Sequence, residues 1–256
     1  MENLLTLFTA FFGLLVGSFL NALIYRIPRR INIAFPRSSC TQCEKIIYWY
    51  ENIPILSYLF LKGKCSGCRE PISPEYPIIE LVTAIFAYFF APKNLESSTL
   101  LNFIFFFSAF CAFLSHLVID LKHQVLPDSI NIYLALLFFM ATFMSRPWIF
   151  WVSGGLLGFG FPLLVSWIFY QLKGQVGLGG GDIKLFGALG IYLGPIGIMQ
   201  NIFLSCLLGA TVGIVLMSFK IIKKENPIPF GPFIIIVASF QIFTESWFNH
   251  LISYIP

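Results

Sequence analysis

Long apolar stretches recur along the whole chain, and they limit the folds that it can adopt. A helix that crosses the hydrocarbon core of a bilayer needs about 20 mostly apolar residues. Eight stretches meet or approach that requirement: residues 4–25, 77–91, 100–119, 129–145, 148–171, 183–195, 197–219 and 230–252. With only 11% charged residues, the chain also lacks the polar surface of a water-soluble protein. We therefore expect an all-α polytopic membrane protein with about eight transmembrane helices in a lipid bilayer.

The basic residues indicate which loops face the cytoplasm. Eight alternating spans divide the loops into two sets, and every Lys and Arg except Lys93 and Arg146 falls in one set. Cytoplasmic loops are enriched in Lys and Arg, so this set is expected to be cytoplasmic. The basic residues are spread over several loops and form no single strip. The net charge of +4 therefore does not indicate nucleic-acid binding.

Four cysteines form the strongest local motif in the sequence. They lie in two CxxC pairs with 21 residues between the pairs: Cys40, Cys43, Cys65 and Cys68. Four thiolates at this spacing can surround one Zn²⁺ tetrahedrally, and a reducing cytoplasm disfavours the alternative of two disulfides. Because the protein would supply all four ligands, no coordination site stays open for catalysis. We expect a structural zinc ion.

These patterns divide the chain into three parts. Residues 1–25 are predicted to form the first transmembrane helix, and residues 26–76 a small cytoplasmic loop domain of the zinc-ribbon type. The metal compensates for a loop that is too small to build a hydrophobic core of its own. Residues 77–256 are predicted to form the transmembrane core. Within the loop, the aromatic stretch Tyr48–Ser57 is typical of a segment at the bilayer interface.

Aspartate is scarce, and its positions are informative. The chain holds only Asp120, Asp128 and Asp182, each at a boundary between an apolar and a polar stretch on the predicted cytoplasmic side. An acid within the membrane costs about 2.5 to 3.5 kcal/mol on insertion scales, so its presence indicates a function. Three aspartates at similar depth predict a paired-carboxylate site. The structural alternative for Asp128 and Asp182 is N-capping of the helices that follow them.

Glu80 is a fourth acid of interest, about one turn into the second apolar stretch. A carboxylate at this depth is costly without a partner. Two interpretations stay open from the sequence, a structural pairing with Lys or Arg and a functional role.

Six segments, taken in order, resemble the type 4 prepilin peptidases, which are bifunctional membrane aspartyl proteases and N-methyltransferases of the wider GxGD protease group. The matching segments are GSFLNALIYRIP, the two CxxC pairs around YENIPILSY, PISPEYPIIE, IDLKHQVLPD, GLGGGDIK and IPFGPF. Thr41 stands where the family often has Pro, a change that leaves the cysteine ligands intact.

The resemblance implies a function at the cytoplasmic face of the bacterial inner membrane. The enzyme would cleave the basic leader of prepilin or pseudopilin precursors, the substrates of type IV pilus and type II secretion systems. It would then methylate the new N-terminal residue with S-adenosyl-L-methionine. The cysteine-bearing loop and Glu80 are candidate contributors to the cofactor site.

The resemblance also implies that Asp182 is one half of an aspartyl dyad. Its partner is Asp120 or Asp128, and the family's LPD pattern favours Asp128. Two close carboxyl groups share a proton and titrate as a pair, which suits one of them to activate water and the other to protonate a carbonyl. Two other functions remain possible from the residues alone: a proton-coupled transporter, and a noncatalytic scaffold whose zinc loop recruits a partner.

Overall fold

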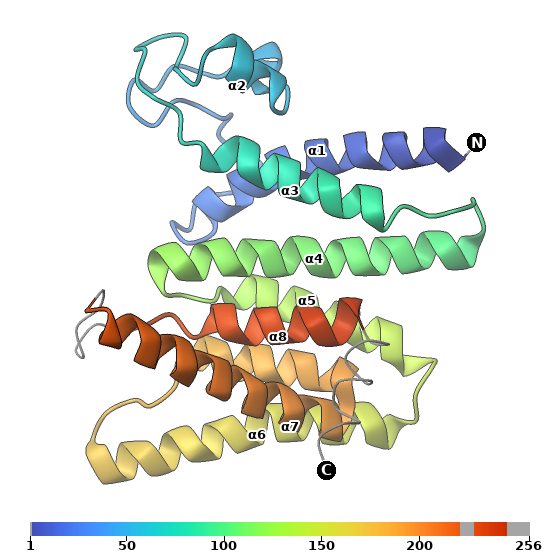
Figure 1. Ribbon diagram of the computed structural model, residues 1–256, viewed down its shortest axis with the longest axis vertical. Helices are drawn as coiled ribbons and strands as arrows, with labels where there is room; N and C mark the ends of the chain where they lie inside the picture. The colour runs from blue at the N-terminus through green and yellow to red at the C-terminus, as the bar shows by residue number, and fades with distance from the viewer. Residues whose placement is uncertain (1, 221–227, 245–256) are drawn as a thin grey trace. The chain divides into compact units, whose positions relative to one another are not determined.

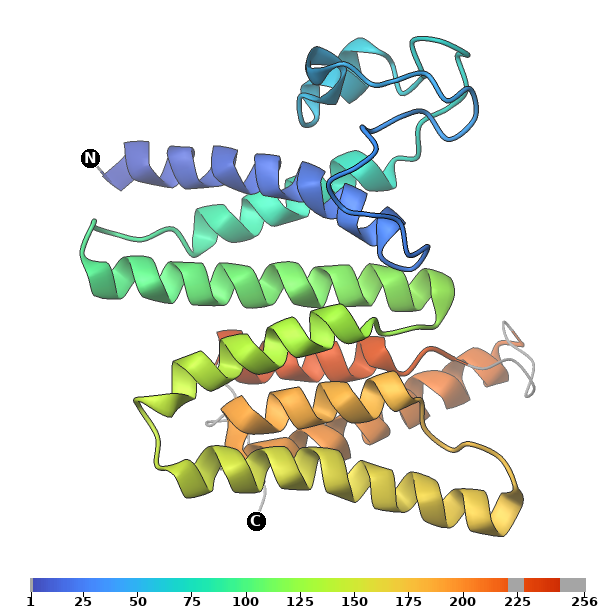
Figure 2. The ribbon, with the colours of Figure 1, turned by 180° about the vertical axis from the view of Figure 1, so that it is seen from behind.

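The computed structural model of the protein describes residues 2–220 and 228–244, which are coloured along the chain in Figures 1 and 2. They form two compact units, Met1–Cys111 and Ala112–Pro256. The elements in order are α1 (Glu2–Arg26), η1 (Trp49–Asn52), α2 (Leu56–Phe60), α3 (Glu75–Phe89), α4 (Ser97–His123), α5 (Asp128–Phe143), α6 (Trp148–Lys173), α7 (Gly180–Ser218) and α8 (Gly231–Phe243). Apart from two isolated β-bridges, the regular structure of these residues is helical, which confirms the predicted all-α class.

Among the residues that the structure describes, four helices are long and apolar enough to cross a membrane. Their qualifying segments are Asn3–Arg26, Ser97–His123, Trp148–Lys173 and Gly180–Ser218. Helices α5 and α8 are apolar but shorter. The multi-pass character is therefore confirmed, whereas the number of eight spans stays a prediction.

The first unit depends on close packing between α1 and α3. A Cβ atom at Gly17 would lie 2.6 Å from the Cα atom of Glu80, and one at Gly13 would lie 2.8 Å from the Cα atom of Ala84. Glycine at both positions lets the two helix backbones approach closely, as is common between membrane helices. Between them, the Asn21 side chain donates a hydrogen bond of 3.1 Å to the Tyr76 carbonyl.

The second unit contains a helix that folds back on itself. Gly194, inside α7, has φ 70° and ψ −176°, and Pro195 follows it. A left-handed φ is readily adopted only by glycine, and proline cannot donate the helical hydrogen bond, so the helix breaks at this pair. The two halves of α7 correspond to the sixth and seventh apolar stretches of the sequence.

Contacts of Phe230 confirm the reversal of α7. Its ring centroid lies 6.3 Å from that of Phe186, and its Cε2 atom would lie 3.3 Å from a Cβ atom at Gly209. In a straight helix, residues 186 and 209 would be about 34 Å apart. The two halves of α7 therefore run in opposite directions, as Figures 1 and 2 show in orange. This fold brings the start of α7 and the start of α8 close together.

Candidate active site and metal centre

Two carboxyl groups lie close enough to influence each other in the second unit, one at the end of α4 and one at the start of α7. Asp120 lies in the last turn of α4, and its residue surface is only 4% exposed. Asp182 lies in the first turn of α7 and is partly buried. The charge of Asp120 acts directly on the carboxyl group of Asp182. The structure therefore brings together two of the three predicted aspartates.

The first residue of α8 holds Asp120. The backbone N–H of Gly231 interacts with the Asp120 carboxylate. A Cβ atom at position 231 would lie 2.6 Å from Asp120 Oδ2 and 3.1 Å from its Cγ. The position therefore needs glycine, because any side chain would displace the carboxylate. The N-terminus of a helix also favours a negative charge through its free N–H groups and its dipole.

The glycine run before α7 holds Asp182 in a similar way. Its carboxylate reaches back to the backbone of Gly179, the residue that precedes the helix, and interacts with the N–H of that residue. A Cβ atom at Gly179 would lie 2.8 Å from Asp182 Oδ2, and one at Gly181 would lie 2.9 Å from the Cβ atom of Leu126. The carboxylate of Asp182 is thus close to the start of its own helix and within the influence of the Asp120 charge.

Asp128 has a different partner. It is the first residue of α5, and both of its carboxylate oxygens accept hydrogen bonds from Lys184 Nζ, at 2.7 and 2.8 Å. Its side chain is 62% exposed and makes no capping hydrogen bond. The LPD pattern favoured Asp128 as the partner of Asp182; in the structure Asp128 bonds to Lys184, and Asp120 is the aspartate whose charge acts on Asp182.

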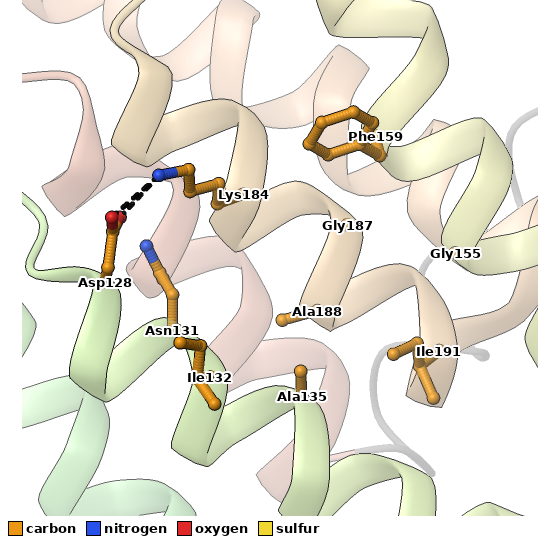
Figure 3. Close-up of a pocket in the computed structure, with 10 residues that line it drawn as sticks. All are labelled: Asp128, Asn131, Ile132, Ala135, Gly155, Phe159, Lys184, Gly187, Ala188 and Ile191. Carbon is orange, nitrogen blue, oxygen red and sulfur yellow. Dashed lines mark hydrogen bonds and ion pairs between the residues drawn. The ribbon is translucent and has the colours of Figure 1, made fainter.

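A cavity of about 400 Å³ lies beside this ion pair, between α5, α6 and α7 (Figure 3). Its lining is mainly apolar, with the pair at one end: Asp128, Asn131, Ile132, Ala135, Gly155, Phe159, Lys184, Gly187, Ala188 and Ile191. At the same end, Asn131 Nδ2 donates a hydrogen bond of 3.3 Å to the carbonyl of Gly181. Asn131 and the ion pair thus fasten the glycine run and the first turn of α7 to α5. The sequence analysis did not identify Asn131, Lys184 or Gly231 as part of the site.

The four predicted metal ligands lie together in the first unit. All four Sγ atoms are within 4.8 Å of one another. Cys40 Sγ lies 3.8 Å from Cys68 Sγ, and Cys43 Sγ lies 3.9 Å from Cys65 Sγ. Sulfur atoms bound tetrahedrally to one Zn²⁺ at about 2.3 Å are about 3.8 Å apart, whereas a disulfide needs about 2.05 Å. The geometry therefore fits a metal ion and not two disulfides.

The two CxxC segments adopt the same local fold. In the first, the Cys40 N–H bonds to the Lys45 carbonyl at 2.9 Å, and in the second the Cys65 N–H bonds to the Glu70 carbonyl at 2.9 Å. An isolated antiparallel bridge closes each turn, Ser39 with Ile46 and Lys64 with Pro71. The repeated turn presents two sulfur atoms from each segment, as a zinc-ribbon site requires.

A small polar network joins the two segments. Lys45 Nζ lies 2.9 Å from Glu51 Oε1 and 2.6 Å from Ser66 Oγ, and the Ser66 hydroxyl donates to the same Glu51 oxygen. The Tyr48 N–H donates to Glu51 Oε2 at 3.0 Å. The hydrogen bonds from Ser66, Tyr48 and Lys45 lower the pKa of Glu51 to about 2. Glu51 is thus an ionised tie between the two cysteine turns.

Glu80 has neutral partners. Its Oε2 accepts a hydrogen bond of 2.7 Å from the Ile55 N–H, and the Ser18 hydroxyl also donates to its carboxylate. The structural alternative in the sequence analysis named Lys or Arg as the partner, and both of these observed donors are uncharged. Glu80 is only 7% exposed and ties the loop before α2 to α3.

Comparisons with known proteins agree with these features. The chain matches the family model of the bacterial peptidase A24 N-terminal domain over residues 11–93. It matches that of the type IV leader peptidase family over residues 105–214. No solved structure gives a significant match.

Curated relatives carry the name prepilin leader peptidase/N-methyltransferase. One from Burkholderia pseudomallei (strain 1026b) is 33% identical, over 89% of this chain and 81% of the relative. One from Aeromonas hydrophila is 34% identical, over 89% of this chain and 86% of the relative. One from Pseudomonas aeruginosa is 33% identical, over 90% of this chain and 87% of the relative. The chain therefore belongs to the type IV leader peptidase family and is a peptidase with N-methyltransferase activity.

Proposed function

We propose that this enzyme cleaves the leader peptide from type IV prepilins or pseudopilins with Asp120 and Asp182 as its catalytic dyad. The observation that carries the proposal is that the charge of Asp120 acts on the Asp182 carboxyl group, while each of the two carboxylates lies against a glycine at the start of a helix. Two carboxyl groups in one site share a proton, which is the state that acid–base hydrolysis of a peptide bond needs.

The dyad performs hydrolysis without a covalent intermediate. One carboxylate takes a proton from a water molecule while the water oxygen attacks the scissile carbonyl carbon, and the other carboxyl group gives its proton to the carbonyl oxygen. The resulting tetrahedral diol collapses as its C–N bond breaks. The leaving nitrogen takes a proton from one carboxyl group, and a diol hydroxyl gives its proton to the other carboxylate, so that the dyad ends singly protonated.

Glycine at positions 179 and 231 serves this chemistry by orientation. Each residue gives its N–H to one carboxylate. Because glycine has no side chain, no Cβ atom crowds that carboxylate. Groups held in this way need little rearrangement during the reaction, and that pre-organisation lowers the barrier.

The second activity is methylation of the new N-terminal residue with S-adenosyl-L-methionine, as the names of the relatives indicate. Glu80 does not fit the role of a cofactor ligand, because it is buried and its carboxylate already accepts hydrogen bonds from Ile55 and Ser18. Its proposed role is to hold the loop in place. The methyl-transfer step is therefore assigned to no residue of this chain.

The four cysteines are proposed to hold one structural Zn²⁺. The S–S separations support a tetrahedral site, and four thiolates leave no position for a substrate. The ion would fix the fold of the loop and supply no catalytic step.

The active site is proposed to face the cytoplasm in the bacterial inner membrane. The excess of Lys and Arg on one side of the predicted spans supports this orientation. A proton-coupled transporter is less well supported, because both carboxyl groups lie at helix ends and not within the middle of a helix. Labelling of cysteines introduced at Lys62 and Ser98 is expected to report opposite sides of the membrane.

Asparagine variants test the dyad, because Asn keeps the size of Asp and removes its titratable proton. Asp120→Asn and Asp182→Asn are each expected to lower cleavage of a purified prepilin by at least about 100-fold, the lower end of acid–base contributions. Asp128→Asn is the matched control and is expected to keep most of the activity. Thermal stability in detergent checks folding.

The same variants can contradict the proposal. An inactive, folded Asp128→Asn protein together with an active Asp120→Asn protein would assign the dyad to Asp128 and Asp182. Activity in both variants would exclude the aspartyl mechanism. Asp182→Asn is also expected to retain methylation of a pilin that has already been cleaved, and loss of both activities in a folded variant would indicate one shared site.

A further inference from the structure

The polar loop of the first unit carries a group of exposed apolar side chains. Six residues of η1, α2 and their flanks make up this apolar edge: Tyr48, Trp49, Tyr50, Leu56, Leu59 and Phe60. Trp49 and Phe60 are the most open, at 81% and 82% exposed. In water, a contiguous apolar surface of this kind normally indicates an interaction site or leads to aggregation.

The geometry makes the edge a continuous surface. Leu56, Leu59 and Phe60 are spaced three and four residues apart, so they share one face of α2. The rings of Tyr48 and Tyr50 are stacked with centroids 5.5 Å apart, and Trp49 packs edge-on against Tyr50 at 5.8 Å. The backbones of α2 and η1 are in contact, so the two elements that carry these side chains are neighbours.

A hydrogen bond fixes the depth of this edge along α3. Ile55, which precedes α2, donates its N–H to Glu80 at 2.7 Å. Glu80 is five residues beyond the start of α3 at Glu75, which places it about 7.5 Å along the helix axis. Figures 1 and 2 both show α2 beside the first turns of α3, not beyond the end of that helix. The edge is therefore held at the level of the N-terminal end of α3.

The charge of the loop fits an anionic surface. Residues 26–76 contain eight Lys and Arg and four Glu, a net charge of 8 − 4 = +4, which becomes 8 − 4 − 4 + 2 = +2 when the four cysteine thiolates hold one Zn²⁺. Lys62 and Lys64 follow α2 directly and are exposed. Basic residues near a membrane surface are attracted to anionic lipids. Amphipathic segments with Trp, Leu or Phe beside Lys are the ones that lie in the headgroup region.

We infer that the apolar edge inserts into the headgroup region of an anionic bilayer, with Trp49, Leu59 and Phe60 among the lipid chains and Lys62 and Lys64 at lipid phosphates. The loop is then a membrane-anchored element beside α3 and not a domain in free solution. The edge is anchored to α3, a helix of its own unit. Lipid around that helix is therefore the partner that reaches the edge without any other protein.

Tryptophan quenching in the full-length, metal-loaded protein tests this inference. The protein is placed in nanodiscs of phosphatidylglycerol with bromine atoms near the headgroup, and the emission of Trp49→Phe is subtracted from that of the wild type, which has 5 tryptophans. The Trp49 share of the emission is expected to be quenched by the brominated lipid and protected from acrylamide. Trp167→Phe is the matched control, because Trp167 is 58% exposed on the long apolar helix α6.

Three further results complete the test. Lys62→Gln with Lys64→Gln is expected to reduce quenching by brominated phosphatidylglycerol while leaving quenching by brominated phosphatidylcholine unchanged. Efficient quenching of Trp49 by acrylamide, with no effect of either brominated lipid, would overturn the inference. Shielding of Trp49 that appears only after a prepilin peptide is added would do the same, and would identify the edge as a protein-docking surface. Neither readout depends on peptidase activity.

Discussion

The backbone of Gly231 lies against the Asp120 carboxylate, and a Cβ atom at this position would lie only 2.6 Å from Asp120 Oδ2. Pro232, in the first turn of α8, is a favoured residue there and helps to start the helix at this point. The contact between Gly231 and Asp120 brings a third segment into the site, in addition to the two that carry the aspartates. Gly231 is therefore a positioning residue for Asp120.

Gly231→Ala is predicted to impair cleavage. The added methyl group would lie 2.6 Å from Asp120 Oδ2, so the carboxylate must move away. Misplacement of a reacting group by about 1 Å can cost on the order of 100-fold in rate. We expect kcat for prepilin cleavage to fall to that extent, with little change in KM.

Gly213→Ala is the control for this substitution. A Cβ atom at Gly213 would meet only Ile228 Cδ1, at an ordinary contact distance of 3.5 Å. This variant is expected to keep wild-type activity. Wild-type kcat in a folded Gly231→Ala protein would show that Asp120 tolerates the shift or takes no part in the reaction.

The sequence predicted the parts of the site that depend on local spacing. The two CxxC pairs specified four ligands, and the glycine run marked Asp182. The partner of Asp182 depends on how the turn between α4 and α5 is folded. There Asp128 starts a helix and bonds to Lys184, while Asp120 stays buried at the end of α4. Neither the hydrophobic periodicity nor the motif spacing of the sequence predicts this difference between Asp128 and Asp120.

Contacts between distant segments were also beyond the sequence patterns. Gly231 reaches Asp120 only because α7 reverses at Gly194 and thereby returns the chain to the start of α8. In the sequence analysis the two halves of α7 were predicted as two separate apolar stretches, residues 183–195 and 197–219. The sequence did not show which residues the second stretch would bring together.

The ion pair between Asp128 and Lys184 is predicted to give modest stability and no chemistry. Both side chains are about half exposed or more, and exposed pairs contribute only about 0.2 to 1 kcal/mol. Asp128→Asn and Lys184→Met should each lower the free energy of unfolding by about that amount. The double variant should lower the free energy of unfolding by less than the sum of the two single variants, because each of the three variants loses the same single interaction. A purely additive cycle in a denaturant titration would mean that the pair does not form in the membrane.

Glu51 is predicted to make the cysteine loop sensitive to acid. Its pKa is about 2 in the folded protein against an ordinary 4.5, because Ser66, Tyr48 and Lys45 bond to the carboxylate. The folded pKa is depressed, so the stabilisation is fully present above the ordinary pKa and is lost as the pH falls from 4.5 towards 2.

Zinc release during an acid titration measures this effect. Glu51→Gln should release the metal at higher pH than the wild type, and the difference between the two should vanish at the lowest pH values. Glu44→Gln is the control, because Glu44 is exposed and belongs to the same loop. Identical release curves for the wild type and Glu51→Gln would show that the Lys45, Glu51 and Ser66 network does not support the site.

Loss of one cysteine ligand is predicted to unfold the loop while leaving the helices intact. Freshly reduced wild-type protein is expected to contain about one zinc per chain, because four thiolates at the observed separations form a complete tetrahedral shell. Binding of a structural zinc supplies about 10 to 16 kcal/mol, far more than a small loop without a core can replace. Cys40→Ser should therefore lose the metal and become sensitive to proteolysis within residues 38–72. Cys206→Ser, on the exposed surface of α7, should keep both metal and protection.

Absence of zinc from the reduced wild type would contradict the metal assignment, and a Cys40→Ser loop that resists protease would show that the loop folds without its metal.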